Sequence, residues 1–272
     1  FDGKTQGQSY HTPILACAML VEACFPMWAM VSGDIDIYQA EEARQLVKTH
    51  LGKEISLPVC VDKDNLLDRL SKHYHGPELL DCFHQLIQMD RGRDRGEILK
   101  FLFDRCERGE VEQWFSENLK ACQSAGQFGA IDLMTDWFNA DQELSRLIQI
   151  ACLQEDGACF NSVDFARGLA ATWISIPKEL VQQLELLQLP KGQPHRVWSL
   201  FGNVFLDIFG GKGRNIRSYI AESEVLSVFE TFFPGDKEIQ AEYTKKTKKL
   251  IESLDLKSQG VDLKALMEEY AN

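Results

Sequence analysis

The chain has 272 residues, of which 44% are hydrophobic and 26% charged, and its formal net charge is −12 at pH 7. This composition is typical of a soluble globular protein and excludes an intrinsically disordered one. The length is sufficient for one large domain or two smaller ones. A charge of this sign repels nucleic acid and anionic membrane surfaces, so neither is expected as a partner.

The first predicted helix covers residues 14–24, after an N-cap at Thr12 and a proline at position 13. It is apolar almost all round, which is typical of a helix buried on most of its faces. The segment is too short to cross a bilayer, and it carries Glu22. The sequence therefore predicts a buried helix and no membrane partner.

The eight cysteines are scattered along the chain without a Cys-x-x-Cys pair. Most occupy apolar positions of helical patterns, where a reduced cysteine behaves as a small hydrophobic residue. We find no signal-peptide pattern, and a reducing, cytoplasmic location is expected. Because the chain starts at Phe1 without a methionine, we also expect it to be part of a longer protein.

Two short apolar runs, residues 27–31 and 55–61, have the length and β-branched content of strands. Each is followed by an Asp-x-Asp triplet and then by a helical pattern. The helix predicted over residues 38–51 begins with a capping box formed by Asp36 and Gln39. These features predict a small α/β element of two short strands over residues 1–62.

The remainder of the chain, residues 63–272, alternates between helical patterns and breaks at glycine or proline. About a dozen helices are expected in all, and successive ones start roughly every 15 to 21 residues, as in helical-repeat arrays. No repeat signature can be aligned, and short loops in an irregular helical domain give the same spacing. The predicted fold is therefore mainly α, a multi-helical domain that is either irregular or a degenerate array of helix pairs.

The two Asp-x-Asp triplets are the first candidate site. Asp34 and Asp36 follow the first predicted strand, and Asp62 and Asp64 follow the second. Carboxylates at strand ends are suitable ligands for Mg²⁺ or Mn²⁺. An aspartate at a helix start is equally explained as an N-cap that favours the helix dipole, and we prefer this interpretation.

A glycine-rich turn at residues 210–215 is the second candidate site. It places Lys212 and Arg214 ahead of a predicted helix, where they can hold a phosphate or carboxylate group. The turn lacks the Gly-Lys-Ser/Thr ending and the preceding strand of a P-loop. A glycine C-cap followed by an asparagine N-cap explains it without a ligand, and we favour that interpretation.

No catalytic constellation stands out from these patterns, and the five tryptophans lie at apolar positions typical of a core. The hypothesis we prefer is a cytoplasmic protein-interaction or scaffold module without a cofactor. Its partner would be another protein or flanking domains of its own chain. The alternative is a divalent-metal-dependent enzyme acting on a phosphorylated or nucleotide substrate, with Mg²⁺ or Mn²⁺ bound by the four aspartates.

Overall fold

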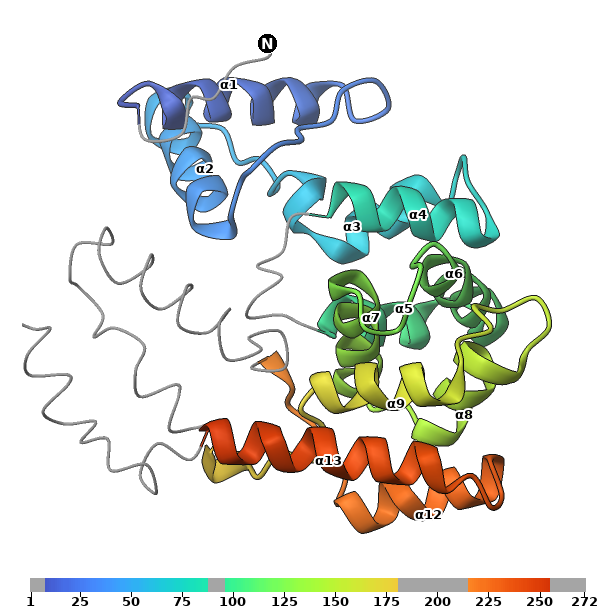
Figure 1. The fold of residues 1–272 in the computed structure, drawn as a ribbon. Coiled ribbons are helices and arrows are strands. Elements are labelled where there is room, and N and C mark those ends of the chain that lie inside the picture. The colour runs from blue at the N-terminus through green and yellow to red at the C-terminus, as the bar shows by residue number, and fades with distance from the viewer. Residues whose placement is uncertain (1–7, 88–95, 181–214, 255–272) are drawn as a thin grey trace, which may run out of the picture. The chain divides into compact units, whose positions relative to one another are not determined.

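The computed structural model describes residues 8–87, 96–180 and 215–254 (Figure 1). These residues are mainly helical and include no strand, so the mainly α fold class is confirmed for the described part of the chain. The chain forms two compact units, Phe1–Asp94 and Arg95–Asn272. The domain boundary expected after residue 62 stays a prediction. The structure also leaves open whether the helices form an irregular domain or a degenerate array of helix pairs.

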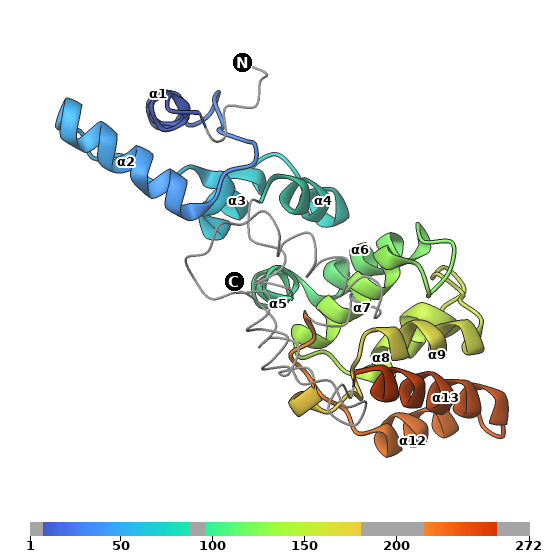
Figure 2. The same ribbon diagram turned by 60° about the vertical axis from the view of Figure 1, so that its left-hand side comes forward.

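The first unit is built on two helices that pack against each other. The described elements of this unit are α1 (His11–Cys24), α2 (Ile37–Leu51), the short 3₁₀ helix η1 (Val59–Val61), α3 (Lys63–Leu70) and α4 (Gly76–Leu86). α1 and α2 cross steeply, since α1 is seen along its length in Figure 1 and end-on in Figure 2. Ala40 and Ala43 of α2 are fully buried in this contact, and their short side chains allow the two helices to approach closely.

The prediction of two strands is wrong for the described residues. Residues 27–31 form a turn and an irregular segment, and residues 55–61 end in the 3₁₀ helix η1. One backbone amide in each segment donates to a side chain and not to a neighbouring strand. Val31 N lies 2.7 Å from Glu22 Oε2, and Val59 N lies 3.0 Å from Glu22 Oε1. The carboxylate thus replaces part of the hydrogen bonding that a β-ladder would supply.

The second unit contains the remaining described helices. They are α5 (Glu97–Arg105), α6 (Arg108–Lys120), α7 (Phe128–Asn139), α8 (Leu144–Ile148), the π-helix η2 (Gln149–Leu153), α9 (Ser162–Ala171), α12 (Glu222–Phe232) and α13 (Lys237–Leu254). α13 lies alongside α9 and next to α12 in both views (Figures 1 and 2). The core is aromatic, with fully buried side chains that include Trp137, Phe115, Phe138, Phe165, Phe229 and Tyr243.

A buried asparagine joins the end of α7 to the segment before α12. Asn139 Oδ1 accepts a hydrogen bond from Arg217 N at 2.7 Å, and Asn139 Nδ2 donates to Asn215 O at 2.9 Å. Gly96 lies so close to Asn139 that a Cβ atom would collide with it, and its φ of +86° also favours glycine. The buried amide of Asn139 thus finds its partners in backbone groups of the segment before α12, as a buried polar side chain requires.

Candidate functional site

Asp36 and Asp62 are N-caps of helices in the structure. Asp36 Oδ1 accepts from Gln39 N at 2.8 Å, and Gln39 Oε1 accepts from Asp36 N at 3.1 Å, which is the capping box expected from the sequence. Asp62 accepts from Asn65 N at 3.1 Å and from Asn65 Nδ2 at 2.6 Å. Both carboxylates thus satisfy amide groups at the first turns of α2 and α3.

The other predicted site residues do not complete a metal site in the described part of the chain. Asp34 is exposed ahead of α2, and Asp64 is exposed in the first turn of α3. Over the described ranges, no three or more histidine, cysteine, aspartate or glutamate side chains form a group that could hold a metal ion. The metal hypothesis stays a prediction, and Lys212 and Arg214 lie outside the described residues.

An ion pair with a buried carboxylate organises the first unit. Glu22 of α1 is only 5% exposed, and its Oε1 lies 3.3 Å from the Arg69 guanidinium of α3. The same carboxylate accepts from the amides of Val31 and Val59, and Arg69 donates to Ala29 O at 2.5 Å. A buried carboxylate requires such partners, because leaving it uncompensated costs several kcal/mol. The pair therefore fixes the segment that follows α1 onto α3.

An exposed apolar turn lies beside this ion pair. Within residues 25–28, Trp28 is 90% exposed, Phe25 57% and Met27 53%. The turn is nevertheless well held, because Trp28 N and Ala29 N both donate to Phe25 O at 2.9 Å. Large apolar side chains are thus presented to solvent on a backbone that is already ordered.

The prediction that the tryptophans are core residues is wrong for Trp28. Trp114, Trp137 and Trp173 are buried as expected, and Trp198 lies outside the described residues. The sequence did contain a signal, because residues 25–28 follow the helix end directly and include Pro26. A side chain just beyond the end of a helix does not have to lie on the buried face of that helix.

The outer face of α1 continues the apolar turn. Cys17, Val21 and Cys24 are exposed, and their spacing of four and three residues places them on one side of the helix. The expectation that this helix is buried on most faces is therefore wrong for its outer side. We call the six residues Cys17, Val21, Cys24, Phe25, Met27 and Trp28 the α1 surface; none of them carries a charge.

A groove of about 600 Å³ adjoins the α1 surface within the first unit. Its lining includes Met19, Met27, Ile55, Pro58, Arg69 and Lys72. One wall is apolar and shares Met27 with the α1 surface, whereas α3 and the residues just after it contribute charged groups of both signs. The lining also includes the carboxylates Glu22, Glu54 and Asp68. A volume of this size accommodates several side chains of a bound segment.

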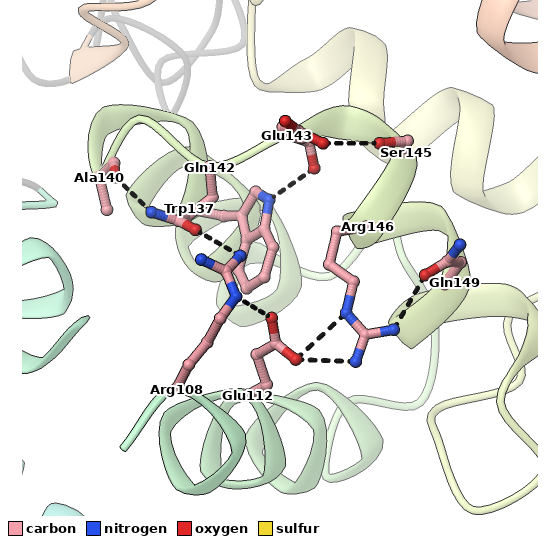
Figure 3. Close-up of polar contacts among 9 residues, drawn as sticks. All are labelled: Arg108, Glu112, Trp137, Ala140, Gln142, Glu143, Ser145, Arg146 and Gln149. Atoms are coloured by element: carbon pink, nitrogen blue, oxygen red, sulfur yellow. Dashed lines mark hydrogen bonds and ion pairs between the residues drawn. The ribbon is translucent and has the colours of Figure 1, made fainter. Parts of the chain in front are cut away.

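A second polar cluster, in the other unit, joins α6 to α8 and η2. Figure 3 shows Glu112 between two guanidinium groups, Arg108 Nε at 2.8 Å and Arg146 Nη2 at 2.7 Å. Arg146 also donates to Gln149 Oε1 at 2.9 Å, and Arg108 donates to Gln142 Oε1 at the same distance. Both oxygens of Glu112 are occupied by neighbours, so the cluster serves to hold the start of η2 in place.

The chain matches no known family model, no curated protein and no solved structure. None of the helices in the described part of the chain combines the length and the apolar character needed to span a bilayer.

Proposed function

We propose that the chain is a protein-interaction module that binds an amphipathic segment of another protein through the α1 surface. The observation that carries the proposal is the 90% exposure of Trp28, next to Phe25 and Met27, on an ordered turn. Tryptophan, phenylalanine and methionine are enriched in the cores of protein interfaces. Because the Glu22–Arg69 pair holds this turn in place, little ordering would be required on binding.

The charge of the surrounding unit supports a partner with cationic groups. Residues 8–87 contain 11 aspartates and glutamates but only 6 lysines and arginines, a net charge of −5. This unit should therefore attract a partner segment whose apolar face is flanked by lysine or arginine side chains. It should repel a segment whose apolar face is flanked by acidic side chains. The partner we propose is a helical segment with one apolar face and cationic edges.

The experiment uses two designed helical peptides with the same leucine-rich face, one with lysine and one with glutamate along its edges. Binding of each labelled peptide to the full chain is measured by fluorescence anisotropy. We expect the lysine peptide to bind more tightly, with an advantage that shrinks as salt screens the charges. Trp28→Ser should weaken binding at least about tenfold, as expected for an interface hot spot.

The matched control is Phe128→Ser, which removes another exposed aromatic side chain from the second unit. Equal binding by the wild type and Trp28→Ser would overturn the proposal. Two further outcomes would assign the α1 surface to another occupant. One is Trp28-dependent binding to zwitterionic lipid vesicles but not to peptides, and the other is Trp28-dependent self-association in sedimentation.

A further inference from the structure

The π-helix η2 and the loop that follows it bring two cysteines of the second unit together. Cys152 lies in η2, and Cys159 lies seven residues later, just before α9. Between them the chain reverses, because Phe160 N donates to Ala151 O at 2.9 Å. Cys152 directly follows the acceptor residue and Cys159 directly precedes the donor residue. The hydrogen bond thus brings the two Cα atoms near the range of about 4.4–6.8 Å that disulfides span.

The loop is closed tightly enough to keep this arrangement. Gly157 N donates to Gln154 O at 3.0 Å, and a Cβ atom on Gly157 would lie 2.5 Å from Ile150 O. Only glycine therefore allows the loop to fold back so closely on η2. The Cys159 Sγ atom lies 3.2 Å from Gln154 O, so its side chain points back toward the end of η2.

The two thiols differ in accessibility. Cys159 is exposed, whereas Cys152 is half-buried. Burial raises the pKa of the Cys152 thiol to about 12, and the nearby Cys159 contributes to the increase. An oxidant in solution therefore meets Cys159 first, and Cys152 is placed to react second.

We infer that Cys152 and Cys159 are a reversible oxidation site that forms an intramolecular disulfide on reaction with a small-molecule disulfide such as oxidised glutathione. This cysteine pair belongs to the second unit, whereas the α1 surface belongs to the first. The bond would lock the loop of residues 154–158 onto η2. The sequence alone does not single out this pair, because Cys17 and Cys24 have the same spacing of seven.

The reaction proceeds by two thiol–disulfide exchanges. Cys159 loses its proton, its sulfur attacks the small disulfide, and one small thiolate leaves and takes up a proton. Cys152 then loses its proton and attacks the Cys159 sulfur, which releases the second small thiol. Two protein thiols are thereby oxidised by two electrons, and one small disulfide is reduced to two thiols.

The experiment treats the full chain with oxidised glutathione, blocks the remaining thiols and maps the peptides by mass spectrometry. We expect a dithiothreitol-sensitive peptide that links Cys152 to Cys159. It should form at least about tenfold faster in the native protein than in urea, because the fold holds the two residues together. Cys152→Ser should stop the reaction at one glutathione on Cys159, and Cys159→Ser should prevent the link.

Cys17 and Cys24 are the matched control, because they are exposed and equally far apart in sequence. On the helix α1 their Cα atoms are about 10 Å apart, which is too far for a disulfide. They should carry glutathione separately in the native protein and link only in urea. The inference would be overturned if native Cys159 kept its glutathione with Cys152 intact, or if the Cys152–Cys159 link formed no faster than in urea.

Discussion

At the scale of single residues, Glu22 shows how one side chain can determine the course of the backbone. Its carboxylate accepts from Val31 N and Val59 N, which lie in segments 28 residues apart in sequence, and it also pairs with Arg69. A charged residue in an otherwise apolar helix indicates a buried partner. The sequence gives no indication that backbone amides are among those partners.

Asp36 distinguishes the capping hypothesis from the metal hypothesis at a single position. Because its carboxylate accepts from Gln39 N, Asp36→Ala should destabilise the protein by about 1 kcal/mol. Asp36→Ser and Asp36→Asn should be near neutral, since both residues cap well. Added Mg²⁺ should leave every melting temperature unchanged. A magnesium-dependent rise in the wild type that Asp36→Asn lacks would instead support a metal site.

Cys60 should make the stability of the first unit sensitive to alkaline pH. Burial, and secondarily the charge of Glu22, raises the pKa of its thiol to about 12 in the folded chain. The unfolded thiol titrates near 8.5, so above that pH the unfolded state loses a proton that the folded state keeps. Stability is therefore retained below about pH 8.5 and decreases from there towards pH 12.

The measurement is urea unfolding at pH 8 and pH 10 for the wild type and Cys60→Ala. Between these pH values the wild type should lose about 2 kcal/mol more than the variant, from 1.36 kcal/mol per pKa unit. Cys60→Ala should be less stable at pH 8, because it leaves a cavity. An equal loss in both proteins would show that the Cys60 thiol titrates alike in the folded and unfolded states.

At the scale of elements, the two arginines that contact Glu112 contribute unequally to holding η2 in place. Arg146 makes two hydrogen bonds to Glu112 Oε2, at 3.1 and 2.7 Å, whereas the more exposed Arg108 makes one to Oε1. Arg146→Met should therefore cost about 1–2 kcal/mol and Arg108→Met less than about 1 kcal/mol. Urea unfolding measures both values. In a Glu112→Gln background the two costs should become similar, and a difference that persisted there would rule out Glu112 as its origin.

The helices could be predicted from the sequence where their determinants, such as a capping box, lie within the helical segment itself. The helix predicted over residues 38–51 is found as α2 (Ile37–Leu51), and the capping box at Asp36 is confirmed. The strands were not predictable, because residues 27–31 and 55–61 have strand-like composition while their partner is the side chain of Glu22. Periodicity describes a segment but does not identify what the segment contacts.

The α1 surface was not predictable for a related reason. An apolar helix is expected to be buried all round, yet Val21 and its neighbours on the outer side of α1 are exposed. Burial is a property of the whole molecule, and composition alone does not show which face lacks a covering element. The same limit applies to Trp28, whose exposure follows from its position in the turn after the helix.

At the scale of the whole molecule, the two compact units predict two separate responses to destabilisation. Each unit contains a buried polar residue that binds backbone groups, Glu22 in the first and Asn139 in the second. Glu22→Ala leaves the half-buried Arg69 guanidinium and two backbone amides without their acceptor, which should cost about 3–5 kcal/mol in total. Asn139→Ala leaves the Arg217 amide and the Asn215 carbonyl without their part-buried hydrogen bonds, at about 1–3 kcal/mol.

Amide hydrogen exchange reports these losses region by region. Glu22→Ala should accelerate exchange in residues 8–87 at least about a hundredfold, since each 1.4 kcal/mol is a factor of ten. The rates in residues 96–180 should stay as in the wild type. Asn139→Ala should give the opposite pattern, with faster exchange in residues 96–180 and 215–254 only. If either variant accelerated exchange equally throughout the described residues, the chain would unfold as one cooperative body despite its two compact units.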